Sequence, residues 1–214
     1  MPQQHRAHAT RQAILSAAAE EFDRAGYAAT PLSAILRRSG VTKGAFYFHF
    51  PSKESLATAL VRAQEAVWPE LYQRWVEQGV DPLRMLVGLV DDLARAIATD
   101  TVVRAGLRLS CESGLIDNDL PSPYPLWERV LFELFDQAGA GGLLRDGVNP
   151  AVAARVVNAA LVGARIISCS LNRCTDVTQR TRELWPLVLR GIATDVWFEG
   201  WVGESRASSP LYAQ

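Results

Sequence analysis

Apolar residues recur at helical spacing along nearly the whole chain, and this periodicity constrains the fold more than any other feature. Ile14, Ala18 and Phe22 are four positions apart and therefore share one face of a helix. No alternating strand pattern and no internal repeat accompanies the helical one. The sequence therefore predicts an all-α protein. We expect helices over residues 10–25, 31–39, 43–50, 53–78, 82–98, 102–111, 125–138, 150–171 and 177–200.

Length and composition place the chain among globular proteins. Its 214 residues, 49% of them hydrophobic and 21% charged, suffice for one large or two small domains with a core. Charged residues interrupt every apolar run before the roughly 18 residues of a membrane span, and no secretory signal opens the chain. The three cysteines have no CxxC spacing, which favours a reducing compartment. We expect a cytoplasmic protein with no membrane contact.

Charge is divided unevenly along the chain. Residues 1–60 contain seven Lys and Arg against four Asp and Glu, a balance of +3, so the remaining residues carry −4 of the total −1. A basic head on a larger acidic body suggests that the head binds a polyanion and the body has another task.

Residues 30–50 have the sequence form of a helix-turn-helix. Thr30 and Pro31 mark the start of one short helix, Gly40 its end, and Thr42 the N-cap of a second. Gly44 leaves the start of the second helix thin, so its backbone can approach the major groove of DNA, where Lys43 can reach guanine O6 or N7.

Other side chains around this second helix suit phosphate contacts, through hydroxyls, an imidazole and an ammonium near a helix N-terminus. The alternative interpretation is that the aromatic residues Phe46, Phe48 and Phe50 are core residues of a bundle, which for Phe48 and Phe50 we expect to hold in part. The expected DNA-binding residues are Thr42, Lys43, Gly44, Tyr47, His49 and Lys53.

Residues 10–56, and above all VTKGAFYFHFPSKESL at 41–56, resemble the DNA-binding domain of TetR-family repressors. The resemblance implies a three-helix DNA-binding domain over 1–52 and a larger helical ligand-binding and dimerisation domain over 53–202. The polar composition of residues 203–214 predicts a flexible tail. The resemblance also implies a homodimer that binds double-stranded operator DNA and is released from it by a small hydrophobic signalling ligand.

A narrower resemblance concerns the body. The segments VVRAGLRLS at 102–110 and PLW at 125–127 are similar to the γ-butyrolactone receptors of this family, although Phe46 and the loop 113–124 depart from that pattern. The resemblance implies that Trp127 stacks on a lactone or furan ligand. Judged by its residue type alone, Trp127 would instead be a core residue.

The remaining ligand-site candidates come from apolar helix faces, where simple core packing is the alternative. Gln64 can hydrogen-bond a ligand or be solvated, and Arg104 and Arg108, four apart, can bind a ligand carboxylate or pair with Asp and Glu. The expected ligand-binding residues are Trp127, Gln64, Trp68, Val90, Leu107, Leu131, Val162 and Ile166.

Other classes of function find less support. All three histidines lie in the first 49 residues, away from the cysteines, so we expect no catalytic residues and no enzyme. Cys169 and Cys174 are five apart, which on one helix separates them by about 140°, so we expect no metal site, and redox sensing is a minor alternative. No cofactor is indicated. A regulator of the same architecture that senses an antibiotic or another hydrophobic compound stays open.

Overall fold

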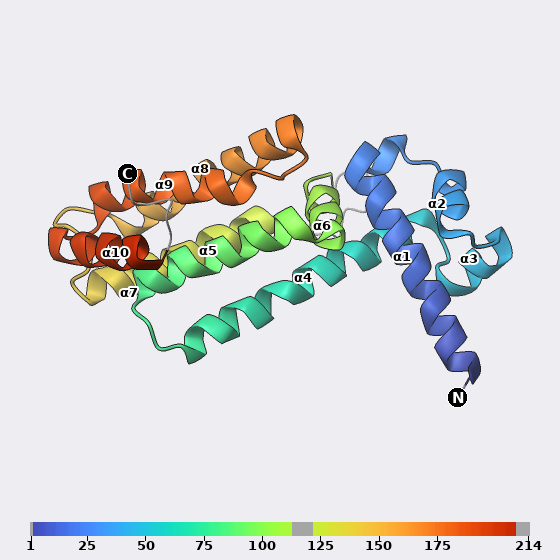
Figure 1. The fold of residues 1–214 in the computed structure, drawn as a ribbon, viewed down its shortest axis with the longest axis horizontal. Coiled ribbons are helices and arrows are strands. Elements are labelled where there is room, and N and C mark those ends of the chain that lie inside the picture. The colour runs from blue at the N-terminus through green and yellow to red at the C-terminus, as the bar shows by residue number, and fades with distance from the viewer. Residues whose placement is uncertain (1, 113–121, 209–214) are drawn as a thin grey trace. The chain divides into compact units, whose positions relative to one another are not determined.

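The computed structural model describes residues 2–112 and 122–208, and every regular element in this part of the chain is an α-helix (Figure 1). The predicted all-α class is therefore confirmed. The helices are α1 Pro2–Ala29, α2 Leu32–Ser39, α3 Lys43–His49, α4 Lys53–Glu77, α5 Pro82–Thr99, α6 Thr101–Cys111, α7 Pro123–Ala140, α8 Pro150–Asn172, α9 Val177–Ile192 and α10 Asp195–Ser208.

The largest differences from the predicted helix boundaries concern the first and the last predicted helix. The first helix begins at Pro2 rather than at residue 10. The sequence does not predict its first part because the residues before Thr10 carry no apolar stripe. The expected helix 177–200 is two helices, since Ala193 is extended and ends α9 before Asp195 starts α10. Helix α10 runs to Ser208, so the expected tail from 203 is helical that far; the loop 113–124 lies largely outside the described residues.

The residues at the ends of α2 and α3 explain why these helices are short. Gly40 closes α2 in the left-handed conformation at φ 67°, which a residue with a side chain rarely adopts. Thr42 caps α3, as predicted, by accepting a hydrogen bond from the Ala45 amide at 3.3 Å. Thr30 does not cap α2 as expected; its hydroxyl donates instead to the carbonyl of Gly26 at 2.7 Å and so ties the α1–α2 turn together.

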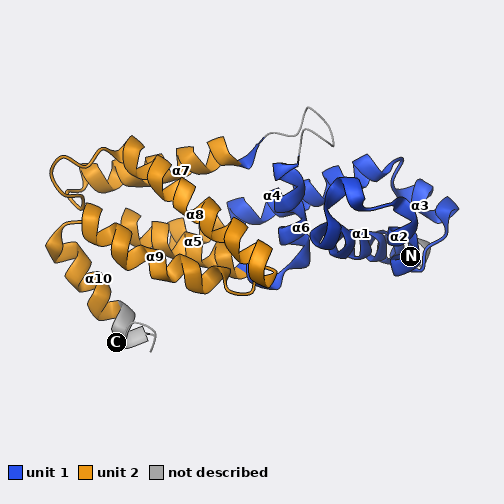
Figure 2. Cartoon of the chain, turned by 90° about the horizontal axis from the view of Figure 1, so that it is seen from above, with its two compact units in different colours: residues 1–70, 96–123 blue, residues 71–95, 124–214 orange. Residues whose placement is uncertain are grey.

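The chain divides into two compact units, residues 1–70 with 96–123 and residues 71–95 with 124–214 (Figure 2). Helices α4 and α5 each contribute to both units. The division differs from the sequence-based boundary after residue 52 because α6 packs against α1 and joins the first unit. We call them unit 1 and unit 2.

Unit 1 has a continuous apolar core to which α1, α2, α3, α4 and α6 contribute. Helix α6 crosses α4 closely at Gly106, where an added Cβ would lie only 2.7 Å from the Leu60 carbonyl oxygen. This approach requires glycine. Side chains that are wholly buried in the core are Ile14, Phe22, Ile35, Phe46, Leu56, Leu60 and Leu109.

A buried carboxylate joins α1 to α2 in unit 1. The Glu21 side chain is only 7% exposed and pairs with Arg24 at 2.8 Å and with Arg38 at 2.6 Å. The hydrogen bonds from Arg24 and Arg38 hold the pKa of Glu21 below its usual value. A carboxylate with a lowered pKa in the folded state stabilises the fold above its unfolded pKa, and this contribution disappears as the pH falls through the folded value.

We expect Glu21→Gln to lower the free energy of unfolding at pH 7 by about 1.5–3 kcal/mol, because a buried charged hydrogen bond is lost. The variant should also lose less stability than the wild type when the pH falls below about 4.5. Urea titrations at several pH values measure both effects. Glu20→Gln is the matched control, since Glu20 also pairs with Arg38 but is 48% exposed. An equal loss in both variants would contradict the role of burial.

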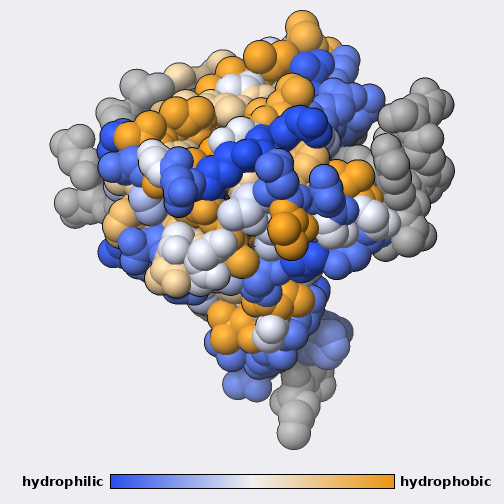
Figure 3. Space-filling view, turned by 90° about the vertical axis from the view of Figure 1, so that its left-hand side faces the viewer, coloured by the Kyte–Doolittle hydropathy of each residue, from blue (hydrophilic) through white to orange (hydrophobic). Residues whose placement is uncertain are grey.

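Unit 2 is built around helices α5, α7, α8, α9 and α10. Trp185 on α9 is wholly buried, and α10 is fastened to the start of α5 because the Trp197 indole donates to Asp81 at 3.0 Å. Arg84 adds hydrogen bonds of 2.9 and 2.6 Å to Glu204. Figure 3 shows the side of the molecule that carries α10 in Figure 1, where hydrophobic residues form separate patches between hydrophilic ones.

Helix α8 leaves an apolar face exposed. It is 23 residues long and, judged by length and composition only, apolar enough to cross a membrane, although just 22% of its most apolar window is buried. Arg155 and Arg165 interrupt its apolar residues, which is why the sequence shows no uninterrupted span. Val156 and Leu171 are 58% and 70% exposed. Within residues 2–112 and 122–208, nothing buries these two side chains.

The structure differs from the expectation that Cys169 and Cys174 lie far apart on one continuous helix. Cys169 and Cys174 form a disulfide, although their spacing would separate them on a continuous helix. The helix ends between them, at Asn172, and Arg173 and Cys174 are left-handed with φ of 52° and 63°, which turns the second sulfur back toward the first. Among the described residues, no group of His, Cys, Asp and Glu could hold a metal ion.

Candidate functional site

The helix-turn-helix of unit 1 presents one side of α3 to solvent and anchors the other in the core. Phe46 is wholly buried and Phe50 nearly so, which confirms that both are core aromatics. Their rings lie 6.0 Å apart. Because these two residues fix the back of a seven-residue helix, the orientation of its front is fixed as well.

The exposed side of α3 carries most of the residues that the sequence predicts to bind DNA. Thr42, Lys43, Gly44 and Tyr47 are all exposed. The Lys43 ammonium lies 6.0 Å from the centre of the Tyr47 ring, so a cation and a phenol hydroxyl are presented side by side. At Gly44 nothing lies within 4 Å of the position of a Cβ, and the helix backbone is bare there.

Phe48 is exposed, contrary to the expectation that it belongs in part to the core. Its side chain is 80% accessible and makes an edge contact with the His49 ring at 5.1 Å. The reason is the helical period: Phe46 and Phe50 are four apart and share the buried face, whereas Phe48 lies about 200° from Phe46 around the helix. The alternation of three aromatic residues hides this difference in the sequence.

Lys53 is turned inward rather than held free beside α3. Its ammonium donates to the carbonyls of Tyr27 at 2.9 Å and Thr30 at 3.0 Å and lies 4.1 Å from the centre of the Tyr27 ring. Burial lowers the pKa of Lys53. The residue thus ties the start of α4 to the α1–α2 turn through two of its three N–H groups.

Two further cations near α3 were not among the predicted residues. Arg37 is exposed on α2, whereas its neighbour Arg38 is neutralised by Glu20 and Glu21. Arg11 on α1 lies over the Phe50 ring at 5.1 Å. The Arg37–Arg38 pair in the sequence is the signal that could have indicated the first; nothing in the sequence indicated the second.

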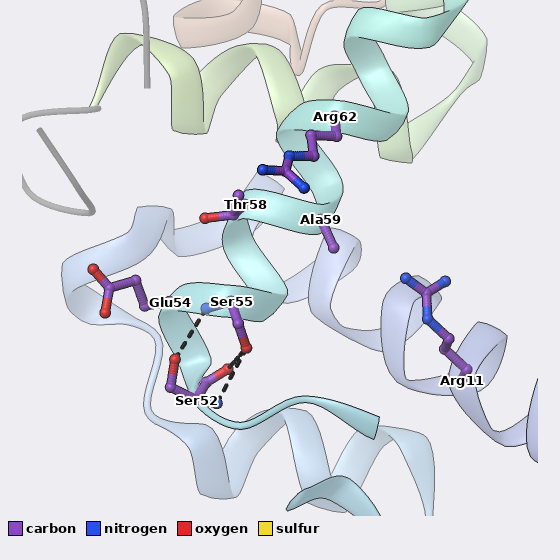
Figure 4. Close-up of a pocket in the computed structure, with 7 residues that line it drawn as sticks. All are labelled: Arg11, Ser52, Glu54, Ser55, Thr58, Ala59 and Arg62. Atoms are coloured by element: carbon purple, nitrogen blue, oxygen red, sulfur yellow. Dashed lines mark hydrogen bonds between the residues drawn. The ribbon is translucent and has the colours of Figure 1, made fainter. Parts of the chain in front are cut away.

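Arg11 also borders a pocket of about 490 Å³ between α1 and the first turns of α4 (Figure 4). The α4 side presents hydroxyls, with Ser52 and Ser55 hydrogen-bonded to each other, and the guanidinium of Arg62. None of the predicted ligand-binding residues lines it. The carboxylate of Glu54 lines it as well, so the lining mixes both charges with hydroxyls.

The predicted ligand-binding residues are distributed over both units. Unit 1 contains Gln64, Trp68 and Leu107, and unit 2 contains the other five. Gln64 is buried, so its alternative interpretation as a solvated residue is wrong. Leu107 is buried as well. Within unit 2, Val90 and Leu131 are buried, while Trp127 and Val162 are half-buried.

Ile166 differs from the other predicted wall residues. It is 48% exposed on α8, next to the equally exposed Ile167, so it does not face the interior of unit 2. The sequence could not show this because both faces of α8 are apolar. A residue that the prediction missed is Trp185: its indole N–H is buried and has no hydrogen-bond partner among the described residues.

Arg104 and Arg108 are engaged with protein groups, in agreement with the second of the two interpretations. Arg104 pairs with Asp23 at 3.1 Å, and Arg108 donates to the Asp23 carbonyl at 2.7 Å and to Glu112 at 3.0 Å. Glu112 in turn accepts from the Tyr27 amide at 2.9 Å. These contacts bind α6 to the last part of α1, where the non-helical conformation of Gly26 interrupts α1.

Protein families with known members match both the helix-turn-helix segment and the helical body of this chain. Residues 14–60 match the model of bacterial regulatory proteins of the tetR family, and residues 81–194 match the tetracyclin repressor-like C-terminal domain. The A-factor receptor protein of Streptomyces griseus is 33% identical over 90% of this chain and 67% of its own length.

Solved structures agree with this assignment. A γ-butyrolactone receptor described as ArpA-like is 32% identical with a TM-score of 0.78, over 89% of this chain and 92% of its own. CprB from Streptomyces coelicolor, in complex with its biological operator sequence, is 32% identical with a TM-score of 0.80, over 92% and 95%. Since family models cover both the helix-turn-helix and the helical body, the chain belongs to the TetR family of bacterial regulatory proteins.

Proposed function

We propose that this protein is a transcriptional repressor that binds a pseudo-palindromic operator and is released by a small signalling molecule of the γ-butyrolactone or furan type. The observation that carries the proposal is the exposed front of α3, fixed from behind by Phe46 and Phe50. Similarity to the A-factor receptor and to γ-butyrolactone receptors supports the signal, and the operator complex of CprB supports the DNA partner. The protein acts in the cytoplasm, where its operator lies.

In this proposal α3 enters the major groove. Lys43 donates to a guanine edge, Gly44 lets the backbone come close, and the hydroxyls of Thr42 and Tyr47 donate to phosphates. His49 and the remaining N–H of Lys53 extend the phosphate contacts. Arg37 on α2 adds a cation of the kind that contributes affinity without sequence preference.

A homodimer is part of the proposal, because two half-sites require two recognition helices about 34–36 Å apart. The exposed apolar faces of α8 and α9 are the proposed interface. Val152 and Val156 are exposed on α8, and Leu187 on α9 is 78% exposed. A face of this kind on a soluble protein normally contacts a partner.

Ligand release requires that the signal bind the two states of the protein with different affinities. Helix α6 is suited to transmit such a difference because its residues Arg104 and Arg108, with Glu112 at its C-cap, hold the end of α1, which packs on α2. We propose that ligand contacts by Trp127, with Trp185 as a further donor, favour one of the two states, and that α6 repositions the DNA-binding helices of unit 1 in that state.

Operator binding by the purified protein tests this function. We expect fluorescence anisotropy to show a specific complex with a palindromic DNA from upstream of its own gene, at about 150 mM salt, with little binding to scrambled DNA. A synthetic long-chain γ-butyrolactone or alkyl furan should then release the DNA. A specific complex that neither compound affects would favour a sensor of another hydrophobic compound, and the absence of a specific complex would refute the repressor.

A further inference from the structure

The corner between α8 and α9 is built around the disulfide Cys169–Cys174. Cys169 lies in the last turn of α8, and Cys174 lies beyond the helix end, three residues before α9 begins. In the described part of the chain, Arg173 and Cys174 are the only residues other than glycine with positive φ. Two consecutive left-handed residues with side chains are unfavourable, so the surrounding structure must hold them in place.

The contacts that hold this corner converge on it from both helices. Asp176 accepts hydrogen bonds from Ser168 in α8, from Asn172 at 2.7 Å and from Arg180 in α9 at 2.8 Å. The bonds from Arg180 and Ser168 lower the pKa of Asp176 to about 2, so this network is complete at neutral pH. The Cys174 amide donates to the Ser168 carbonyl at 3.2 Å. The disulfide is the one covalent link in the network.

The two sulfur-bearing residues differ in access. Cys174 is only 3% exposed, whereas Cys169 is half-buried. Cys169 is the more accessible residue of the pair, so we expect a small thiol from solvent to attack there, with the buried Cys174 sulfur as the leaving group. A disulfide with one accessible sulfur can undergo exchange, in contrast to one that is wholly enclosed.

The corner also adjoins the exposed apolar face described above. Ile167 and Leu171 lie within the last two turns of α8, beside Cys169 in sequence, and both are exposed. A change in the conformation at the end of α8 would therefore change how its apolar face is oriented relative to the apolar face of α9. This link to the interface rests on the proposed homodimer, whereas the thiol chemistry does not.

We propose that Cys169–Cys174 is a reversible oxidation site, through which low-molecular-weight thiols and disulfides set the conformation of the α8–α9 corner and, with it, dimerisation and operator affinity. In reduction, a thiolate attacks the Cys169 sulfur, the bond between the two protein sulfurs breaks, and the Cys174 sulfur takes the electron pair and then a proton. A second thiol attacks the mixed disulfide, which releases a small disulfide and the Cys169 thiol. The net exchange consumes two small thiols and is reversed by the small disulfide.

A redox titration of the full chain tests the site. The protein is equilibrated in mixtures of reduced and oxidised glutathione, quenched by alkylation and weighed by mass spectrometry. We expect one two-electron transition in which both cysteines become alkylated together. Hydrogen exchange at the Cys174 and Val177 amides should accelerate about tenfold over the same transition, because the corner opens. Cys111→Ser is the control variant and should show the same transition.

The effect on assembly is measured on the same samples. We expect reduction to weaken dimerisation in sedimentation velocity, and operator affinity in anisotropy, by about tenfold each. The double variant C169S/C174S should behave like the reduced protein at every glutathione ratio. If the transition occurs without a change in exchange or in assembly, the switch is refuted; if no glutathione ratio forms the bond, the site is refuted. Failure to bind any operator, with a normal transition in mass and exchange, would instead count against the repressor.

Discussion

Replacing Gly44 with leucine is expected to abolish specific operator binding without loss of stability. At this position no described residue outside the local helix backbone lies within 4 Å of an added Cβ, and the residue is exposed in the first turn of α3. A helix also gains up to about 1 kcal/mol when glycine is replaced by a good helix former. A leucine here would occupy the space that the proposed complex gives to the edges of the bases.

The expected loss of affinity follows from the DNA contacts that the substitution leaves in place. Phosphate contacts from Thr42, Tyr47 and Arg37 are untouched, so affinity should fall to that for scrambled DNA, a loss of about a thousandfold or more. Anisotropy on operator and scrambled duplexes measures it, with thermal unfolding as the check on stability. Gly203→Leu is the matched control, since Gly203 is an exposed helical glycine with nothing within 4 Å. Operator binding by Gly44→Leu within tenfold of the wild type would mean that α3 does not enter the groove in the proposed way.

The sequence predicts the fold class and the DNA-binding end well because local signals determine both. Thr42 and Gly40 mark the ends of short helices through hydrogen bonds and backbone conformations that depend on neighbouring residues only. The helical period places Phe46 and Phe50 on one face and Phe48 on the opposite face. It does not show which of these two faces is buried, and for this reason the expected partial burial of Phe48 is wrong.

Contacts between residues distant in the sequence were beyond such signals. The pairing of Arg104 with Asp23 across 81 positions and the inward turn of Lys53 depend on how α6 and α4 pack against α1. The disulfide depends on where α8 ends, which a left-handed Arg173 decides rather than a glycine or a proline. The exposure of one side of α8 could not be predicted for a related reason. In the sequence, an apolar helix face that packs on the core has the same pattern as one that binds a partner.

Replacing Trp127 with alanine is expected to abolish the response to a γ-butyrolactone while leaving operator binding unchanged. The half-buried indole offers a flat apolar face, which an aromatic residue at the centre of a binding site can use to contribute about 2 kcal/mol or more. Ligand affinity should therefore fall about thirtyfold or more. Calorimetric titration with the lactone measures the affinity, and anisotropy measures the release of operator DNA.

Two further variants show what the indole contributes. Trp127→Phe keeps a ring and loses the N–H, so near-normal affinity in this variant would assign the contribution to stacking. Trp75→Ala is the matched control: Trp75 is also half-buried in unit 2, but its indole donates to Asp92 at 3.1 Å and its ring packs on Gly88. We expect Trp75→Ala to lower stability and to keep the ligand response. If Trp127→Ala releases operator at the same lactone concentration as the wild type, the ligand does not stack on Trp127. The buried N–H of Trp185, which has no hydrogen-bond partner in the described part of the chain, then becomes the better guide to the pocket.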